Sequence, residues 1–211
     1  MYHEALGKEN HPDWQNGEFG MFKLIQKTLP SHIGIFNPNL EDFWGLAMFV
    51  KNDINIKTEG VLAVHTATGS LEEQRNGHTS KNIQYVTLEV DGKMVSVINF
   101  HGLWNGKGKT DTQERIVQSQ NILDFLQELS GEYILCGDFN LTPDTKSLLM
   151  FEEFGMQNLI KDYGVSSTRT SFYTKPGKFA DYMFITPGLE VKDFEVLPEE
   201  VSDHAALYLE V

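Results

Sequence analysis

The sequence predicts an α/β fold in a single domain spanning residues 1–211, with two packed sheets covered by helices. Three observations support this: β-rich apolar runs in both halves of the chain, long amphipathic helical segments between them, and no repeat, low-complexity tract or linker. A chain of 211 residues fits one domain and can bury a sizeable core. Strands that flank and alternate with helices are typical of layered α/β folds.

The first half predicts one helix followed by strands. Residues 17–29 place apolar side chains at helical spacing, and Pro30 ends that pattern. Residues 83–90 and 94–100 predict two strands joined through Asp-Gly, a sequence that favours a β-hairpin. Three short apolar runs before this hairpin predict further strands, at 33–36, 45–51 and 61–65.

The second half alternates helices with strands. Residues 142–154 predict a helix with Thr142 as its N-cap and Pro143 in its first turn. Residues 112–129 predict a long amphipathic helix whose apolar stripe is formed by Ile116, Gln120, Leu123, Leu126 and Leu129. The strands of this half are expected within residues 133–139, 179–185, 189–197 and 204–211.

The net charge of −13 limits the classes of partner. It has the wrong sign for a strong grip on long duplex nucleic acid, which depends on counterion release by basic residues. An acidic chain attracts cations, and clustered carboxylates suit a hard divalent ion such as Mg²⁺. No apolar stretch approaches the roughly 20 residues that span a bilayer, and the first ten residues lack the pattern of a signal peptide. We therefore expect a cytoplasmic monomer.

Polar groups stand at the ends of four predicted strands. Asp138 and Asn140, two residues apart, project from one face of their strand where it leaves the core. Asp181 precedes an apolar run, which is an expensive place for an unpaired carboxylate. The other two ends carry Asn99 with His101 and Asp203 with His204.

Each of these ends also has an ordinary structural explanation. Residues 137–140 could form a turn, His101 could be a semi-buried histidine, Asp181 could pair with Lys178, and residues 202–203 could form a loop. Four such ends in one small domain nevertheless favour a shared site.

The segments "GDFN" (137–140), "FADYMFI" (179–185) and "SDHAAL" (202–207), preceded by a strand that ends in His101, resemble the endonuclease/exonuclease/phosphatase superfamily. The order and spacing match from about Phe43 to Val211. "GDFN" with a downstream "SDH" is a specific combination, although either motif alone is weak. The resemblance implies the DNase-I-like fold, a four-layer α/β/β/α sandwich of two mixed sheets.

The resemblance also implies a metal-dependent hydrolase that cleaves phosphoester bonds by in-line attack of water, helped by Mg²⁺ or Mn²⁺. Asp138 would orient or deprotonate the water, and Asn140 would hold the phosphate or the attacking group. His204 would contact the scissile phosphate while Asp181 fixes its tautomer. Asp203 would bind metal or steady its ligands. The expected metal residues are thus Asp138, Asn140 and Asp203.

His101 would bond a phosphate oxygen or assist the leaving group. The loop "GKGKT" beside it is no phosphate loop, because Leu103 stands where the first glycine is required. Two groups of residues are expected to meet the substrate, against the alternatives of a solvated loop and of plain packing: Lys107, Lys109 and Arg115 after His101, and Arg169 and Tyr173 ahead of Asp181.

The chain departs from the family pattern at its start. Family members open with a strand that ends in a catalytic Asn, followed by a strand that ends in Gln-Glu, whose Glu is the principal metal ligand. Residues 1–7 resemble the stretch after that Glu. We therefore expect a domain that lacks roughly its first 30–40 residues, judged by ordinary domain sizes. Weakened metal affinity and exposed sheet edges would follow.

Two hypotheses from different classes remain. The first is an active phosphodiesterase, nuclease or phosphatase, with a small or lipid-like phosphoester favoured over long duplex DNA because of the charge. The second is a catalytically silent domain of the same fold that binds phosphorylated ligands or a partner protein.

Overall fold

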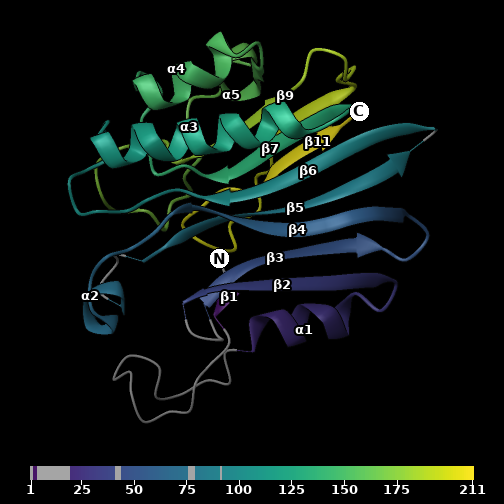
Figure 1. Ribbon diagram of the computed structural model, residues 1–211, viewed down its shortest axis with the longest axis horizontal. Coiled ribbons are helices and arrows are strands. Elements are labelled where there is room, and N and C mark those ends of the chain that lie inside the picture. Colours follow the sequence, from purple (N-terminus) through teal and green to yellow (C-terminus); the bar gives the residue numbers. More distant parts are fainter. Residues whose placement is uncertain (1, 4–19, 41–43, 76–78, 91) are drawn as a thin grey trace.

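The computed structural model describes residues 2–3, 20–40, 44–75, 79–90 and 92–211, which form a layered α/β structure (Figure 1). Helix α1 covers one side of a small sheet, a six-stranded sheet packs against the other side of that small sheet, and helices α3 and α4 cover the far face. The predicted α/β/β/α order of layers is therefore present.

The six-stranded sheet is the mixed one. Its only parallel pair among the described strands joins β6 to β7, and the crossover that such pairing needs is supplied by α3, Gln113–Glu128. The strand order is β4 (Asn55–His65), β5 (Lys81–Val90), β6 (Lys93–His101), β7 (Glu132–Asp138), β9 (Asp181–Ile185) and β8 (Gln157–Asn158).

The second layer differs from the predicted mixed sheet. The small sheet β1–β3–β2 pairs only antiparallel among its described strands, and β10–β11 form a separate antiparallel pair. Helix α1, Met21–Thr28, covers the small sheet, and the Phe22 ring packs on Phe36 and Phe49. The strand bounds are Tyr2–His3 (β1), His32–Leu40 (β2), Trp44–Lys51 (β3), Asp193–Val196 (β10) and Leu207–Glu210 (β11).

The predicted elements hold in type, with shorter bounds in places. Residues 17–19 of the first predicted helix, Asp91 of the hairpin turn and Phe43 lie outside the described residues. The last two predicted strands shorten to β10 and β11. Two short helices, α2 (Leu71–Arg75) and α5 (Leu159–Asp162), and the two-residue strand β8 have no counterpart in the sequence prediction.

The predicted stripe of α3 holds in part, because Leu123 and Leu126 are buried, but the buried face also includes residues outside that stripe. Gln120 is exposed, whereas Arg115 and Gln118 are buried and bind the backbone of Leu103, which each contacts through one hydrogen bond. The apolar pattern did not predict the burial of Arg115 and Gln118, because both are polar. They are buried because they bind the backbone of the segment that follows β6. Farther along the helix, Ile122 and Leu126 complete this face.

The start of α4, Lys146–Glu153, also corrects the prediction. Its N-cap residue is Thr145, and Thr142 with Pro143 lies in the turn before it. A residue distant in the sequence binds the first helical N–H groups: the Asp111 carboxylate accepts hydrogen bonds from Lys146 N and Ser147 N at 2.7 and 3.0 Å. A carboxylate at a helix N-terminus also interacts favourably with the helix dipole.

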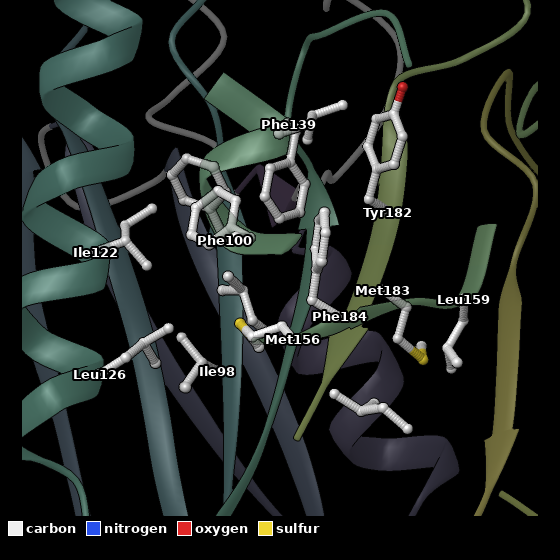
Figure 2. Close-up of a cluster of buried hydrophobic side chains, with 14 of the residues drawn as sticks. Ile98, Phe100, Ile122, Leu126, Phe139, Met156, Leu159, Tyr182, Met183 and Phe184 are labelled. Atoms are coloured by element: carbon white, nitrogen blue, oxygen red, sulfur yellow. The ribbon is translucent and has the colours of Figure 1, made fainter. Parts of the chain in front are cut away.

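The main core lies between the six-stranded sheet and helices α3 and α4, and it is rich in aromatic rings (Figure 2). Phe139 is central: its ring meets Phe100, Phe151 and Tyr182 edge-on, with centroids 5.0–5.8 Å apart. Edge-to-face pairs of this kind add stability beyond the area that they bury. The core therefore reaches the residue that directly follows β7 and anchors the end of that strand.

Gly137 allows the closest approach in this region. Its φ is +141°, and a Cβ there would lie 1.9 Å from the carbonyl oxygen of Phe100 in the neighbouring strand β6. No side chain fits without moving backbone. Glycine is therefore required for β6 and β7 to stay in register one residue before Asp138.

We predict that Gly137→Ala lowers the free energy of unfolding by about 3 kcal/mol or more, because it adds a backbone clash to an unfavourable φ. Gly155→Ala is the matched control, because Gly155 also has positive φ (+101°) but open space around it. The control should lose only about 1–2 kcal/mol. Urea unfolding of both variants measures the difference, and equal losses would contradict the clash.

Candidate active site

Strand register assembles the centre of the site. Asp138 at the end of β7 lies beside His101 of β6 on one side and beside Asp181 of β9 on the other. These residues lie 37 and 43 positions from Asp138 in the sequence. One row across the sheet therefore carries three of the five predicted catalytic side chains.

The fourth predicted catalytic residue, His204, arrives from the segment before β11. A pocket of about 450 Å³ lies above this row, between β3 and the ends of β6 and β7. It is lined by His101, Asp138, Asp181, Asp203 and His204, together with Leu46, Ala47, Asn99, Phe100, Gly137 and Ser202. Four of the five predicted catalytic residues therefore line one pocket, whereas Asn140 does not.

Asp181 holds the His204 imidazole. The ring Nδ1 lies 2.8 and 2.9 Å from the two carboxylate oxygens of Asp181. A carboxylate only accepts hydrogen bonds when ionised, so this contact places the proton on Nδ1. Nε2 is then free to face the pocket, where it lies 3.8 Å from Asp138 Oδ2.

His101 faces the same oxygen from the opposite strand, with its Nε2 3.9 Å from Asp138 Oδ2. Both nitrogen–oxygen distances exceed hydrogen-bond length, so neither imidazole nitrogen is hydrogen-bonded to this oxygen. Burial, reinforced by the nearby Lys81 charge, lowers the pKa of His101 well below its usual value, which makes the ring neutral at pH 7. A neutral ring that presents Nε2–H is a hydrogen-bond donor without a charge.

Asp138 sits in an environment that disfavours its charge. Burial raises its pKa, and the neighbouring Asp181 carboxylate raises it further, against the opposing effect of His204. Its Oδ1 accepts a hydrogen bond from Asn140 N at 2.8 Å, so Oδ2 is the oxygen that faces the two imidazoles. A carboxyl group with a raised pKa is suited to accept a proton.

Asn140 connects backbone segments next to the site and does not itself line the pocket. It adopts a positive φ of 55°, and its side-chain Nδ2 donates to the carbonyl of Gly102 at 3.1 Å. Gly102 N in turn donates to Asp138 O. Asn140 thus ties the chain after β7 to the chain after β6, and it is not among the residues that line the pocket.

The predicted metal residues do not form a coordination shell by themselves. The Asp203 carboxylate pairs with Arg169 Nη1 at 3.0 Å, while the Asn140 amide is bound to Gly102. In the part of the chain that the structure describes, no group of three or more His, Cys, Asp or Glu side chains is placed to hold a metal ion. The described residues therefore do not fit a complete Mg²⁺ or Mn²⁺ site.

The predicted substrate-binding residues divide into three groups. Lys109 and Arg169 both lie over the Tyr173 ring, 5.2 and 4.3 Å from its centroid, next to the pocket residue Asp203. Lys107 is exposed on its loop. Arg115 is buried, with 1% of its surface accessible, and donates to backbone carbonyls, so its position does not support a direct substrate contact.

Lys81 is a charged neighbour that the sequence did not reveal. It begins β5 and is 2% exposed, and its charge interacts with Asp138 and His101. Burial lowers its pKa to about 8. In the sequence it stands among polar residues before a strand, so only strand pairing places it near the site.

The sequence model of the Endonuclease/Exonuclease/phosphatase family matches residues 9–204, and the chain therefore belongs to this family. The sequence is also 30% identical over 117 residues to a UPF0294 protein of Vibrio vulnificus (strain YJ016). That match covers 56% of this chain and 39% of the relative, so the chain spans about two fifths of the length of this curated relative.

Solved structures share the fold. A mannosyl-6-phosphatase of Bacteroides thetaiotaomicron superimposes with a TM-score of 0.69 at 19% identity, covering 90% of this chain and 80% of that one. The human Nocturnin catalytic domain with bound sulfate gives 0.67 at 18% identity, covering 91% and 77%. Identities this low establish the DNase-I-like fold alone.

None of the described helices is long and apolar enough to cross a membrane.

We predict that Asp138→Asn stabilises the protein at pH 7. A raised pKa means that the folded state holds its proton more tightly than the unfolded state, so wild-type stability falls as pH rises from about 4 through the folded pKa. The variant lacks this loss. Its melting temperature should exceed that of the wild type at pH 7, by about 2–4 °C for each kcal/mol, with the gap closing toward pH 4. Equal melting temperatures at both pH values would contradict the raised pKa.

We predict that Lys81→Met is also stabilising at pH 7. Because the folded pKa is about 8 and the ordinary value 10.5, the unfolded state binds the proton more tightly, and wild-type stability rises with pH between these values. Removing the buried charge should add roughly 3 kcal/mol at pH 7. The gain should shrink toward pH 10.5. Denaturant unfolding at pH 7 and pH 10 measures it, with the exposed Lys93→Met as control.

Proposed function

We propose that the chain carries the acid–base centre of a phosphoesterase, which directs water at a phosphorus atom in line with the leaving group. The observation that supports this most strongly is the arrangement of His204 Nε2 and His101 Nε2 around Asp138 Oδ2, with His204 held through Nδ1 by Asp181. Membership of the Endonuclease/Exonuclease/phosphatase family supports the same reaction class.

In the proposed reaction, the water oxygen bonds to phosphorus and the phosphorus–oxygen bond to the leaving group breaks. The leaving group departs as its oxyanion, p-nitrophenolate for bis-p-nitrophenyl phosphate, and takes any proton it needs from solvent. Asp138 Oδ2, with its raised pKa, accepts the proton that the attacking water loses. His101 donates its Nε2–H to a phosphoryl oxygen. When protonated on both nitrogens, His204 donates its Nε2–H to a phosphoryl oxygen, and the Asp181 carboxylate stabilises this imidazolium.

Mg²⁺ or Mn²⁺ dependence is part of the proposal. The acidic chain and the pocket-facing Asp138 oxygen support it, because hard divalent ions prefer carboxylate oxygens. The proposed substrate is a small or lipid-like phosphoester rather than long duplex nucleic acid, in keeping with the net charge of −13. Lys107, Lys109, Arg169 and Tyr173 are the proposed substrate contacts. We propose a cytoplasmic monomer.

A second candidate function is a silent domain that binds phosphorylated ligands or a partner protein without hydrolysis. One observation favours it: the described carboxylates do not assemble a metal site, since Asp203 is engaged by Arg169. The pocket would then retain its imidazole and cation donors for phosphate. Hydrolysis is the property that separates the two candidates.

We predict measurable hydrolysis of bis-p-nitrophenyl phosphate when Mg²⁺ or Mn²⁺ is added, followed by p-nitrophenol absorbance. Asp138→Ala and His204→Asn should each lower kcat by about 10²–10⁴-fold, the usual range for removal of an acid–base group. The control Asp124→Ala alters an exposed carboxylate on α3 that bonds only to Gln120 among the described residues. It should leave the rate unchanged.

Calorimetric titration with inorganic phosphate, together with the hydrolysis assay, distinguishes the phosphoesterase from the silent binding domain. Phosphate binding without turnover by the wild type would support the silent domain. Turnover that is unchanged in Asp138→Ala would contradict the proposed roles.

A further inference from the structure

The Asp181–His204 pair joins two segments that are 23 residues apart, and neither segment fixes the pair alone. Asp181 is the first residue of β9. His204 lies in an irregular segment ahead of β11, where its backbone forms an isolated bridge to Arg169 and local hydrogen bonds with the Ser202 hydroxyl. The contact between the two side chains is 2.8 Å, so its geometry depends on whatever holds both backbones in place.

Thr168 contacts both segments. Its side-chain Oγ1 accepts hydrogen bonds from Ala180 N at 3.1 Å and from Asp181 N at 3.2 Å. Its backbone carbonyl accepts from Ala205 N at 3.1 Å, directly after His204. One residue thus bonds to the backbone of Asp181 and to the residue next to His204.

Burial makes these hydrogen bonds matter. Thr168 and Ala180 are fully buried, and Asp181 is 9% exposed. A hydroxyl oxygen has two lone pairs, and here both serve N–H groups. Without the hydroxyl, two buried N–H groups at the start of β9 would lose their partner, which the backbone can relieve only by moving. Movement at this place shifts the Asp181 carboxylate directly.

The neighbouring residues reinforce the same connection. Arg169 forms the isolated β-bridge with His204, and its Nη1 pairs with Asp203. Thr170 N donates to Asp203 O at 3.3 Å. Residues 168–170, which we call the strap, therefore bind three consecutive residues of the His204 segment. Thr168 is the member of the strap that also reaches Asp181.

We propose that Thr168 is a positioning residue that sets the distance between Asp181 and His204. The proposal rests on the proposed phosphoesterase function for its kinetic consequence, although the positioning itself does not. Thr168 is not among the pocket-lining residues, so it acts through the pair rather than on substrate.

Thr168→Val tests this role, because valine keeps the shape of threonine and removes its hydroxyl. We expect kcat for bis-p-nitrophenyl phosphate to fall by about 10–100-fold, as small displacements of catalytic groups do. KM should stay within about twofold, because substrate contacts are untouched. Thr168→Ser keeps the hydroxyl and should restore most of the rate.

A second readout is independent of catalysis. The His204 Nδ1–H proton can be followed by NMR on protein labelled with ¹⁵N-histidine, and His204→Gln identifies its signal among the seven histidines. In Thr168→Val its exchange with water should accelerate by roughly tenfold or more, because the hydrogen bond to Asp181 opens more often. Thr168→Ser should retain slow exchange.

Thr87→Val is the matched control. Thr87 is also buried, and its hydroxyl bonds to Ser96 Oγ at 2.9 Å in the β5–β6 hairpin, away from the pocket. This variant should lose stability and keep both kcat and the slow His204 exchange. Wild-type exchange in Thr168→Val, or the same acceleration in Thr87→Val, would overturn the positioning role. Absence of turnover in the wild type would count against the phosphoesterase function alone, since the exchange measurement still decides the role of Thr168.

Discussion

The pairing of β6, β7 and β9 is the constraint on which the site depends. This register places His101, Asp138 and Asp181 in one row, and the close contact at Gly137 leaves little freedom to change it. A slip by one residue would turn side chains to the opposite face of the sheet. The aromatic core around Phe139 holds the end of the same row from below. Packing energy far larger than any single polar contact therefore fixes the positions of the polar groups.

Electrostatics within the row follow from that packing. Two carboxylates and a neutral imidazole lie together at the edge of an apolar core. Burial lowers the pKa of His101, and burial together with the Asp181 carboxylate raises the pKa of Asp138. Lys81 adds a buried cation at a stability cost. Shifted pKa values of this kind are common at sites where residues are arranged for chemistry rather than for stability. Within a few residues, the buried ionisable groups of the site lower the stability of the fold, while the apolar packing beside them raises it.

The sequence predicted much of this arrangement, and the failures have physical causes. Asp138, Asp181 and His204 were predictable because each stands at the boundary of an apolar run. The alignment of these boundaries needs only ordinary strand pairing. Arg115 was wrongly assigned to the substrate, since its burial depends on how α3 rotates against the sheet. The start of α4 was wrong because its capping carboxylate, Asp111, comes from 35 residues away. Lys81 and Thr168 were missed because their significance exists only in three dimensions.

The attachment of the site to strand ends has one more consequence. His101, Asp138 and Asp181 belong to the sheet, whereas the proposed substrate contacts Lys107, Lys109, Arg169 and Tyr173 lie in the connecting segments 102–112 and 163–180. Insertions or deletions in such connections leave a strand row in place, because surface loops tolerate changes of length. Substrate preference can therefore change through these connecting segments while the geometry of the strand row stays the same. A shared scaffold with divergent specificities is the evolutionary outcome that this division allows.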